Sequence, residues 1–369
     1  MLDKAKVLKG LIAVEGSLFS DHSEEYARAR EVWQKICADG AFLYKVNGAH
    51  VAWPLPTWQG ELGAQQVIPV QVEPYCVASV DGSQVFPDRH QGTMCSLINV
   101  GSVILSYGLA RRGAELLNEP FVYTGQDNTT SLMGEELISC QRQEHELASA
   151  VELGRRLTSE LDAQIPTFIF NDGSLIFWLL EAQDHVKRDL FLPRYVAHLQ
   201  ALYEMRMPCV GYISMPHSRE LVGLLRLAAG DTDGKLFAHT LDATIAGFFL
   251  NTYEHTTIFE SHASICAAYP VHLKPHFLYV HVRDEIARLE IPAWIAVDAV
   301  MVEMIVKVVV DQVKKGYGYP VALAEAHEQA VVKGPDREFF YHIITKMGIE
   351  QRRRTGISLK SAKKRSVAV

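Results

Sequence analysis

The sequence contains no hydrophobic run long enough to cross a membrane. A transmembrane helix needs about 20 consecutive apolar residues, and every apolar stretch of this 369-residue chain is interrupted sooner. The first residues, Met1 to Lys6, lead into an amphipathic helical pattern and not into the apolar core of a signal peptide. We therefore expect a cytoplasmic protein that has no membrane partner.

Cys-X-X-Cys pairs are also absent. The six cysteines are scattered along the chain, and most of them lie in apolar stretches: Cys37, Cys76, Cys95, Cys140, Cys209 and Cys266. Zinc sites and disulfide frameworks use close, regular cysteine spacings, whereas single cysteines in apolar stretches are typical of packed cores. The pattern argues against a zinc site and against a fold held together by disulfides.

A surplus of basic residues is missing as well. The chain has 36 Lys and Arg against 43 Asp and Glu, a formal net charge of −7. A nucleic-acid partner would therefore have to be held by local basic patches and not by the overall charge. One such patch lies at the C-terminus, where a single acid, Glu350, stands among Lys346, Arg352, Arg353, Arg354, Lys360, Lys363, Lys364 and Arg365. Residues 349–369 are either a solvated tail or an arm that contacts phosphate or a partner.

What the sequence does contain is one short pattern that occurs twice. An apolar, strand-like run ends in Asp81-Gly82-Ser83, and a second run ends in Asp172-Gly173-Ser174. Glycine after the aspartate permits a sharp exit from the strand or a close approach by another group. Asp and Gly are also ordinary turn residues, so one copy alone would indicate little. Two copies suggest that two strands of one sheet bring two carboxylates together.

The order of the expected elements indicates an α/β fold. Three strands near residues 75–80, 95–106 and 121–123 read as an antiparallel meander, and the pattern continues with a helix at 131–162, a strand at 167–170, a helix at 174–205 and a strand at 209–214. This is the order of a ribonuclease H-like fold, a mixed five-stranded sheet with flanking helices. We expect an N-terminal helical segment over 1–70, one domain over 71–348 with an insertion at about 230–275, and a basic tail over 349–369.

In that fold, acidic side chains on separate elements hold metal ions. Asp81 and Asp172 end the first and fourth strands, and His327 lies on a late helix. The first helix offers several acids, of which Glu146 adjoins the apolar stripe most closely, with Glu144 and Glu152 as the alternatives. Carboxylate oxygens suit Mg²⁺ or Mn²⁺, and an imidazole favours Mn²⁺. Two such ions can stabilise the charge that develops when a phosphodiester is cleaved.

The late helix is preceded by the segment Gly316-Tyr317-Gly318-Tyr319-Pro320. Tyr319 is kept out of helical geometry by the proline that follows it, and Pro320 suits a first helical turn. Tyr319 and His327 could therefore line one site, although each could equally be an ordinary packing residue.

Together these segments resemble the NurA nucleases over residues 75 to 345. The resemblance is carried by Ser79 to Ser83, the Glu146 helix, Phe170 to Leu175, Arg288 to Trp294, and the block from Tyr319 to His327. It implies a metal-dependent 5′–3′ exonuclease and single-strand endonuclease that acts in DNA end resection at double-strand breaks. It further implies Mn²⁺, with Mg²⁺ possible, as cofactor, a homodimer, and a HerA-type hexameric translocase as partner. The implied metal ligands are Asp81, Glu146, Asp172 and His327, with Tyr319 as a further catalytic residue.

The strand-like run Arg288-Leu289-Glu290-Ile291 alternates charged and apolar residues. This is typical of a half-exposed edge strand with a surface ion pair. We predict instead that Arg288 contacts the DNA backbone. A further alternative is that it supports the residues that bind the metal.

Two other functions fit parts of the pattern. Actin-like phosphotransferases also carry two Asp-Gly-Ser or Asp-Gly-Thr turns, but each follows a three-strand meander, and a glycine-rich segment binds the adenosine. Here a long helix precedes the second copy, and no such glycine-rich segment is evident. A non-catalytic scaffold of the same fold would not need Asp81, Asp172 and His327 together.

Overall fold

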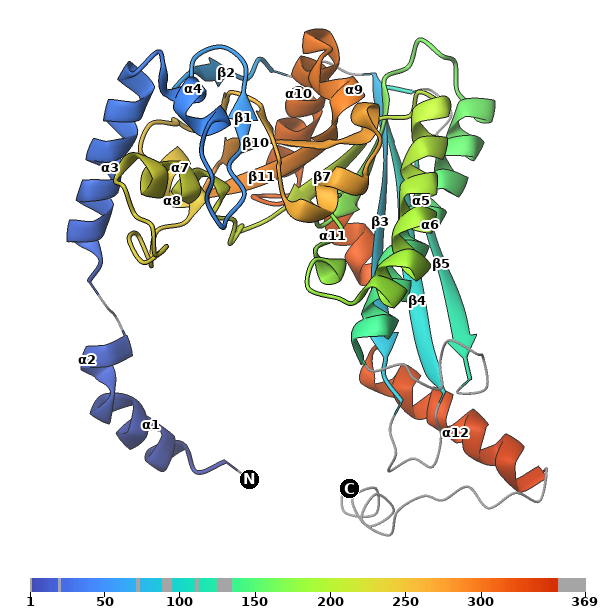
Figure 1. Cartoon of the computed structure of the whole chain (residues 1–369). Coiled ribbons are helices and arrows are strands. Elements are labelled where there is room, and N and C mark those ends of the chain that lie inside the picture. Colours follow the sequence, from blue (N-terminus) through green and yellow to red (C-terminus); the bar gives the residue numbers. More distant parts are fainter. Residues whose placement is uncertain are drawn as a thin grey trace.

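The computed structural model describes residues 2–18, 21–70, 74–87, 95–109, 113–124 and 135–350. Its centre is a large mixed sheet, whose main path runs β1-β9-β10-β11-β7-β6-β3-β4-β5 (Figure 1). Two further strands, β2 and β8, extend it beside β10. The strands are β1 (Thr57–Trp58), β2 (Gln65–Val67), β3 (Tyr75–Val85), β4 (Ser96–Tyr107), β5 (Ala114–Tyr123), β6 (Thr167–Asp172), β7 (Cys209–Ile213), β8 (Glu254–Thr256), β9 (Phe259–Glu260), β10 (Pro275–Val282) and β11 (Glu285–Pro292).

The expected meander and the two strands after it are present. Strands β3, β4 and β5 pair antiparallel, while β6 pairs parallel with both β3 and β7. The prediction of only five strands is wrong, because β11 adds to β7 and continues the sheet through β10. The segment expected to be an insertion supplies β8 and β9, and these pair with β2 and β1 of the N-terminal segment. The short strands β1, β2, β8 and β9 have only two or three residues each, too few for a strand pattern in the sequence to predict them.

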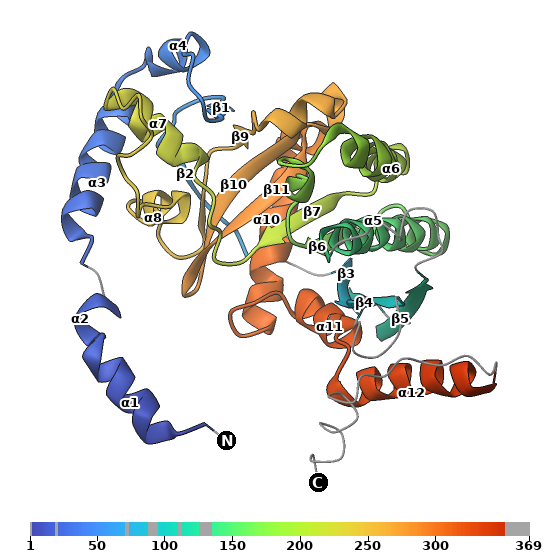
Figure 2. The same cartoon turned by 60° about the horizontal axis from the view of Figure 1, so that its bottom comes forward.

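Helices cover both faces of the sheet (Figure 2). They are α1 (Lys4–Ala13), α2 (Glu15–Leu18), α3 (Ser23–Ala38), α4 (Phe42–Asn47), α5 (Glu135–Glu160), α6 (His185–Glu204), α7 (Glu220–Ala228), α8 (Asp242–Ala246), α9 (Ala293–Ala296), α10 (Ala299–Lys315), α11 (Val321–Ala330) and α12 (Gly334–Glu350). Alternate residues of β3 face opposite sides, as the period of a strand requires. Cys76, Ala78 and Val80 share a core with α5 and α6, whereas Tyr75 and Val77 share one with α10.

The first and the last helix of the described residues are less tightly packed than the rest. Helices α1 and α12 contain no buried residue, and they project from the body of the molecule (Figures 1 and 2). Of the basic patch, Lys346 lies on α12, and the residues from Arg352 onward fall outside the described part of the chain. No helix in that part is long and apolar enough to cross a membrane. The six cysteines all lie within it; none forms a disulfide, and four are buried.

Helix α11 packs unusually close to the strands beneath it. The side chains of Ser83 and Asn99 donate to the Ala330 carbonyl over 2.5 and 2.8 Å, at the end of the helix. At Gly101 of β4, a Cβ would lie under 3.0 Å from the backbone of Ala330 and Ala326. The absence of a side chain at Gly101 therefore lets α11, which carries His327, lie directly on the sheet.

Replacing Gly101 by alanine should destabilise the protein by about 3 kcal/mol or more, because the added methyl group meets backbone atoms that cannot rotate away. Thermal or urea unfolding measures the change. Gly113→Ala is the matched control, since nothing lies near a Cβ at that position, and it should change stability by no more than about 0.5 kcal/mol. Equal stability of the two variants would show that α11 does not rest on Gly101.

Candidate metal centre

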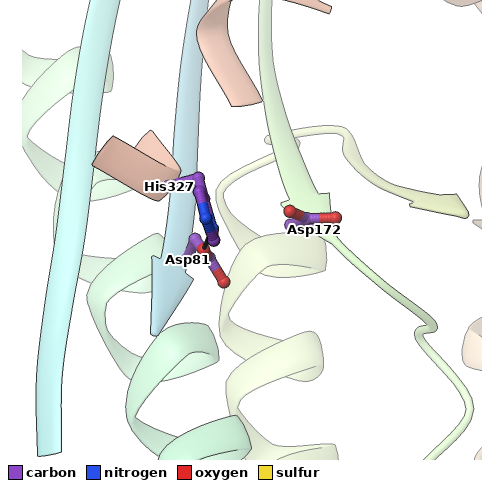
Figure 3. A group of neighbouring side chains, drawn as sticks. All are labelled: Asp81, Asp172 and His327. Carbon is purple, nitrogen blue, oxygen red and sulfur yellow. Dashed lines mark hydrogen bonds and ion pairs between the residues drawn. The ribbon is translucent and has the colours of Figure 1, made fainter. Parts of the chain in front are cut away.

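Three of the predicted ligands meet where β6 ends beside the interior of β3. Val80 of β3 lies opposite Asn171 of β6 in a parallel register, so Asp81 and Asp172 occupy the next position on each strand. His327 reaches the same place from α11 (Figure 3). One ligand atom from each of the three side chains lies within 4.8 Å of the others. Two carboxylate oxygens and one imidazole nitrogen at this separation can hold a divalent cation.

The three side chains differ in exposure and in bonding. The Asp81 side chain is 10% exposed and that of His327 is 58% exposed, so the cluster is open to solvent on the helix side. His327 Nδ1 lies 2.7 Å from Asp81 Oδ2. Because an ionised carboxylate can only accept, Nδ1 is the donor of this bond, and Nε2 is the ring nitrogen left to bind a metal.

The Asp172 carboxyl lies in an environment that disfavours its negative charge. Burial and then the nearby charge of Asp81 raise its pKa above the ordinary value, while a hydrogen bond from Tyr319 and the proximity of His327 act in the opposite direction. A divalent cation between the carboxylates would remove the repulsion. The donor set and this repulsion together fit a metal ion.

Tyr319 is the fourth predicted residue that the structure brings to this place. Its hydroxyl donates to Asp172, and burial together with that carboxylate raises the pKa of the phenol. Its ring packs edge-on against Tyr212, with the centroids 5.4 Å apart. Pro320 follows as the N-cap of α11. Tyr319, which Pro320 keeps out of the helix, thus points toward Asp172.

Of the three acids considered on the first helix, only Glu146 is near the cluster. Glu144 pairs with Arg194, and Glu152 is 74% exposed and pairs with Arg155. Glu146 is 2% exposed, and it does not belong to the three-residue ligand group found among the described residues. Its carboxylate is bonded to Arg142, whose guanidinium also donates to the Gly82 carbonyl over 3.2 Å. The structure therefore places Glu146 beside the ligand group.

The electrostatics of Glu146 reflect this position. Burial is the main cause that raises its pKa to about 8; Asp81 and Asp172 raise it further, and Arg142 opposes them. Glu146 is therefore coupled by charge to both aspartates, although its oxygens point at Arg142.

The two glycines of the repeated pattern serve different purposes. A Cβ at Gly82 would lie under 3.0 Å from Glu146 Oε1 and Arg142 Cγ, so this glycine makes room for that pair. Gly173 has a φ of +123°, a conformation that a residue with a side chain adopts only under strain. The first glycine is required for close packing and the second for the turn after Asp172.

The structure corrects the prediction that Arg288 contacts DNA. Strand β11 is not an edge strand, because it lies between β10 and β7. Arg288 is 1% exposed, and its guanidinium bonds Glu290 and Glu220 at 2.8 and 2.7 Å. A side chain buried in this way cannot reach a DNA strand.

Sequence reasoning overlooked two residues next to the predicted ligands. Arg142 stands four positions before Glu146, the spacing of neighbours on a helix, and that spacing was a usable signal. Glu290 accepts hydrogen bonds from the turn that follows Asp172. Its signal was the alternation of charged and apolar residues, which places it on the same face of the strand as Arg288.

Comparison with known proteins assigns the family. The NurA domain model matches residues 76–332. The chain belongs to the NurA family. Among solved structures, a crystal structure of NurA has 10% identity and a TM-score of 0.42, covering 94% of this chain and 98% of that one. NurA bound to dAMP and manganese has 10% identity, a TM-score of 0.37, and coverage of 90% and 94%. NurA with manganese has 11% identity, a TM-score of 0.39, and coverage of 85% and 96%. No curated protein sequence matches this NurA-family chain.

Proposed function

We propose that this NurA-family protein is a metal-dependent deoxyribonuclease, a phosphodiester hydrolase that uses Mn²⁺ and accepts Mg²⁺. The observation that carries the proposal is the group of Asp81, Asp172 and His327, whose ligand atoms lie within 4.8 Å of one another beside an open surface. The imidazole favours Mn²⁺ over Mg²⁺. Manganese is also named for two of the NurA crystal structures.

The residues of the site have separate tasks in this proposal. Asp81, Asp172 and His327 would hold the cation, which when bound lowers the cost of the negative charge that develops on the phosphate oxygens. The Tyr319 hydroxyl donates to Asp172 and limits its rotation. The Nδ1 proton of His327 orients Asp81. Arg142 bonds Glu146 behind the three ligands, and Glu146 as a fourth metal ligand stays a prediction.

The fold supports this assignment over a kinase. We propose a ribonuclease H-like core made of β5-β4-β3-β6-β7, because a three-strand meander is followed by two parallel strands. Both Asp-Gly-Ser segments lie on neighbouring strands of this one sheet. In a phosphotransferase of the actin type they would belong to two separate halves, each with its own meander.

The wider role follows from the family. We propose 5′–3′ exonuclease and single-strand endonuclease activity in DNA end resection and double-strand break repair. We further propose that the protein forms a homodimer and works with a HerA-type hexameric translocase. Sedimentation equilibrium tests the dimer, and stimulation of DNA degradation by such a translocase with ATP tests the partnership. A monomer, or a rate unchanged by the translocase, would contradict the corresponding part.

The central test is cleavage of linear single- and double-stranded DNA labelled at one end. We expect products with Mn²⁺, fewer with Mg²⁺ and none with EDTA, because the carboxylates need the cation to act on phosphate. Asp172→Ala should be inactive with either metal. Asp233→Ala, an exposed acid that pairs with Lys235, should be as active as the unchanged protein. Cleavage that persists in EDTA or in purified Asp172→Ala would refute the metal site.

A further inference from the structure

The turn that follows Asp172 wraps around a buried carboxylate. Glu290 of β11 is 1% exposed, and its Oε2 accepts from Ser174 Oγ at 2.6 Å, Leu175 N at 2.8 Å and Ile176 N at 3.4 Å. The turn begins directly after a ligand of the metal centre. A single side chain from a distant strand therefore binds three consecutive residues, the serine of the second Asp-Gly-Ser segment and the two residues after it.

Strand β7 lies between β6 and β11, and the absence of a side chain at its residue Gly211 permits this contact. Glu290 lies opposite Gly211 of β7, and Gly211 in turn lies opposite Asn171 of β6. A Cβ at Gly211 would meet the Gly173 carbonyl at 2.6 Å and Leu175 N at 3.2 Å. The turn can therefore cross over β7 at Gly211 and reach β11.

An ionised carboxylate at this depth needs a counter-charge, and Arg288 supplies it. Arg288 and Glu290 lie two residues apart on the same face of β11, and Arg288 Nε donates to Glu290 Oε1 over 2.8 Å. Arg288 is itself fixed, because it also bonds Glu220 and stacks 3.8 Å above the ring of Phe277. Burying an ion without such partners destabilises the folded state. One oxygen of Glu290 is thus held by the arginine, and the other is free to bind the turn.

We propose that Glu290 is a positioning residue for the metal centre, and that it sets the direction of the Asp172 carboxylate and thereby the affinity for the divalent cation. The proposal rests on the metal site of the proposed function. Tyr319 limits the Asp172 side chain, and Gly173 N donates to the Tyr212 carbonyl over 3.0 Å. Glu290 adds the remaining constraint, because it holds residues 174–176, which begin two positions after the ligand.

The test compares two carboxylates that bind the same arginine. Glu290→Gln removes the charge at the turn, while Glu220→Gln removes the other buried partner of Arg288 and touches no residue of 173–176. Mn²⁺ affinity is measured by electron paramagnetic resonance or calorimetry, and stability by thermal unfolding. Glu290→Gln should bind Mn²⁺ about 10- to 100-fold more weakly, the usual effect of losing a residue behind a metal ligand. Glu220→Gln should lose stability but bind Mn²⁺ as the unchanged protein does.

A second variant covers the case in which Glu290→Gln does not fold. Ser174→Ala removes one hydrogen bond to Glu290 without leaving a charge unpaired, and it should also weaken Mn²⁺ binding. Unchanged Mn²⁺ affinity in the folded Glu290→Gln or Ser174→Ala protein overturns the proposal, as does an equal loss in Glu220→Gln. If the unchanged protein binds Mn²⁺ but does not cleave DNA, the proposed nuclease function fails, while the affinity comparison still decides the role of Glu290.

Discussion

Replacing Asp81 by asparagine should lower DNA cleavage on the order of 1,000-fold, because it removes a charge that acts directly on the reacting centre. An amide oxygen is a weaker, neutral ligand for Mn²⁺. The same change alters His327, since its Nδ1 proton loses an ionised acceptor. Both kcat/KM on single-stranded DNA and the affinity for Mn²⁺ should fall when they are measured in this variant.

The Asp81→Asn protein should remain folded. Its side chain lies near Asp172 and Glu146, and both of their pKa values are raised in part by the charge of Asp81. Removing that charge relieves repulsion, so the metal-free variant should unfold at the same temperature or higher. Asp298→Asn is the matched control, because it changes an N-cap of α10 to an equally good cap. If Asp81→Asn cleaves DNA at a rate within tenfold of the control, the assignment of Asp81 as a metal ligand is contradicted.

The second large effect concerns stability and pH at Glu146. Its pKa is about 8 in the folded, metal-free protein, above the ordinary value near 4.5 in the unfolded chain. The folded state therefore holds this proton more tightly, and the stability that results is present below pH 4.5 and lost as the pH rises to about 8. Glu146→Gln cannot lose the proton. At pH 8 and above, the variant should be more stable than the unchanged protein, on the order of 4 kcal/mol.

Urea unfolding in EDTA at pH 5 and at pH 8.5 measures this difference. The two proteins should be alike at pH 5, where the carboxyl is protonated, and should diverge at pH 8.5. Glu152→Gln, on the same helix but 74% exposed, serves as the control and should show no such divergence. A Glu146→Gln protein that follows the pH profile of the unchanged chain would show that Glu146 is ionised in the folded state. Unchanged Mn²⁺ binding by Glu146→Gln would show that Glu146 does not ligate the metal.

Some features could be derived from local patterns alone. The strands that carry Asp81 and Asp172 were predictable, because each contains a short run of apolar and β-branched residues before Asp-Gly-Ser. The predicted end at Asp81 is wrong, because β3 continues to Val85 in pairing with β4. His327 and Tyr319 were predictable from the proline between them and from the helical pattern that follows. These signals lie within about ten residues, the range over which strand and helix periodicities operate.

Arg288 shows why other features could not be derived. Its alternating pattern is correct for a strand, but the pattern does not say whether the strand is an edge or an interior one. That depends on the pairing of β11 with β7, some 75 residues earlier in the chain. The three acids on α5 pose the same difficulty, because only the packing of the helix against Gly82 distinguishes Glu146 from Glu144 and Glu152.

The sequence by itself therefore determined which residue types are available for metal chemistry and on which elements they lie: Asp81 and Asp172 on two strands and His327 on a late helix. The tertiary structure decided which of them meet and what holds them. Parallel register aligns the two aspartates, Gly101 lets α11 bring His327 down to them, and Gly211 lets the turn after Asp172 reach Glu290. The physical reason is that local periodicity sets secondary structure, whereas the contacts between elements depend on close packing of segments that are distant in the chain.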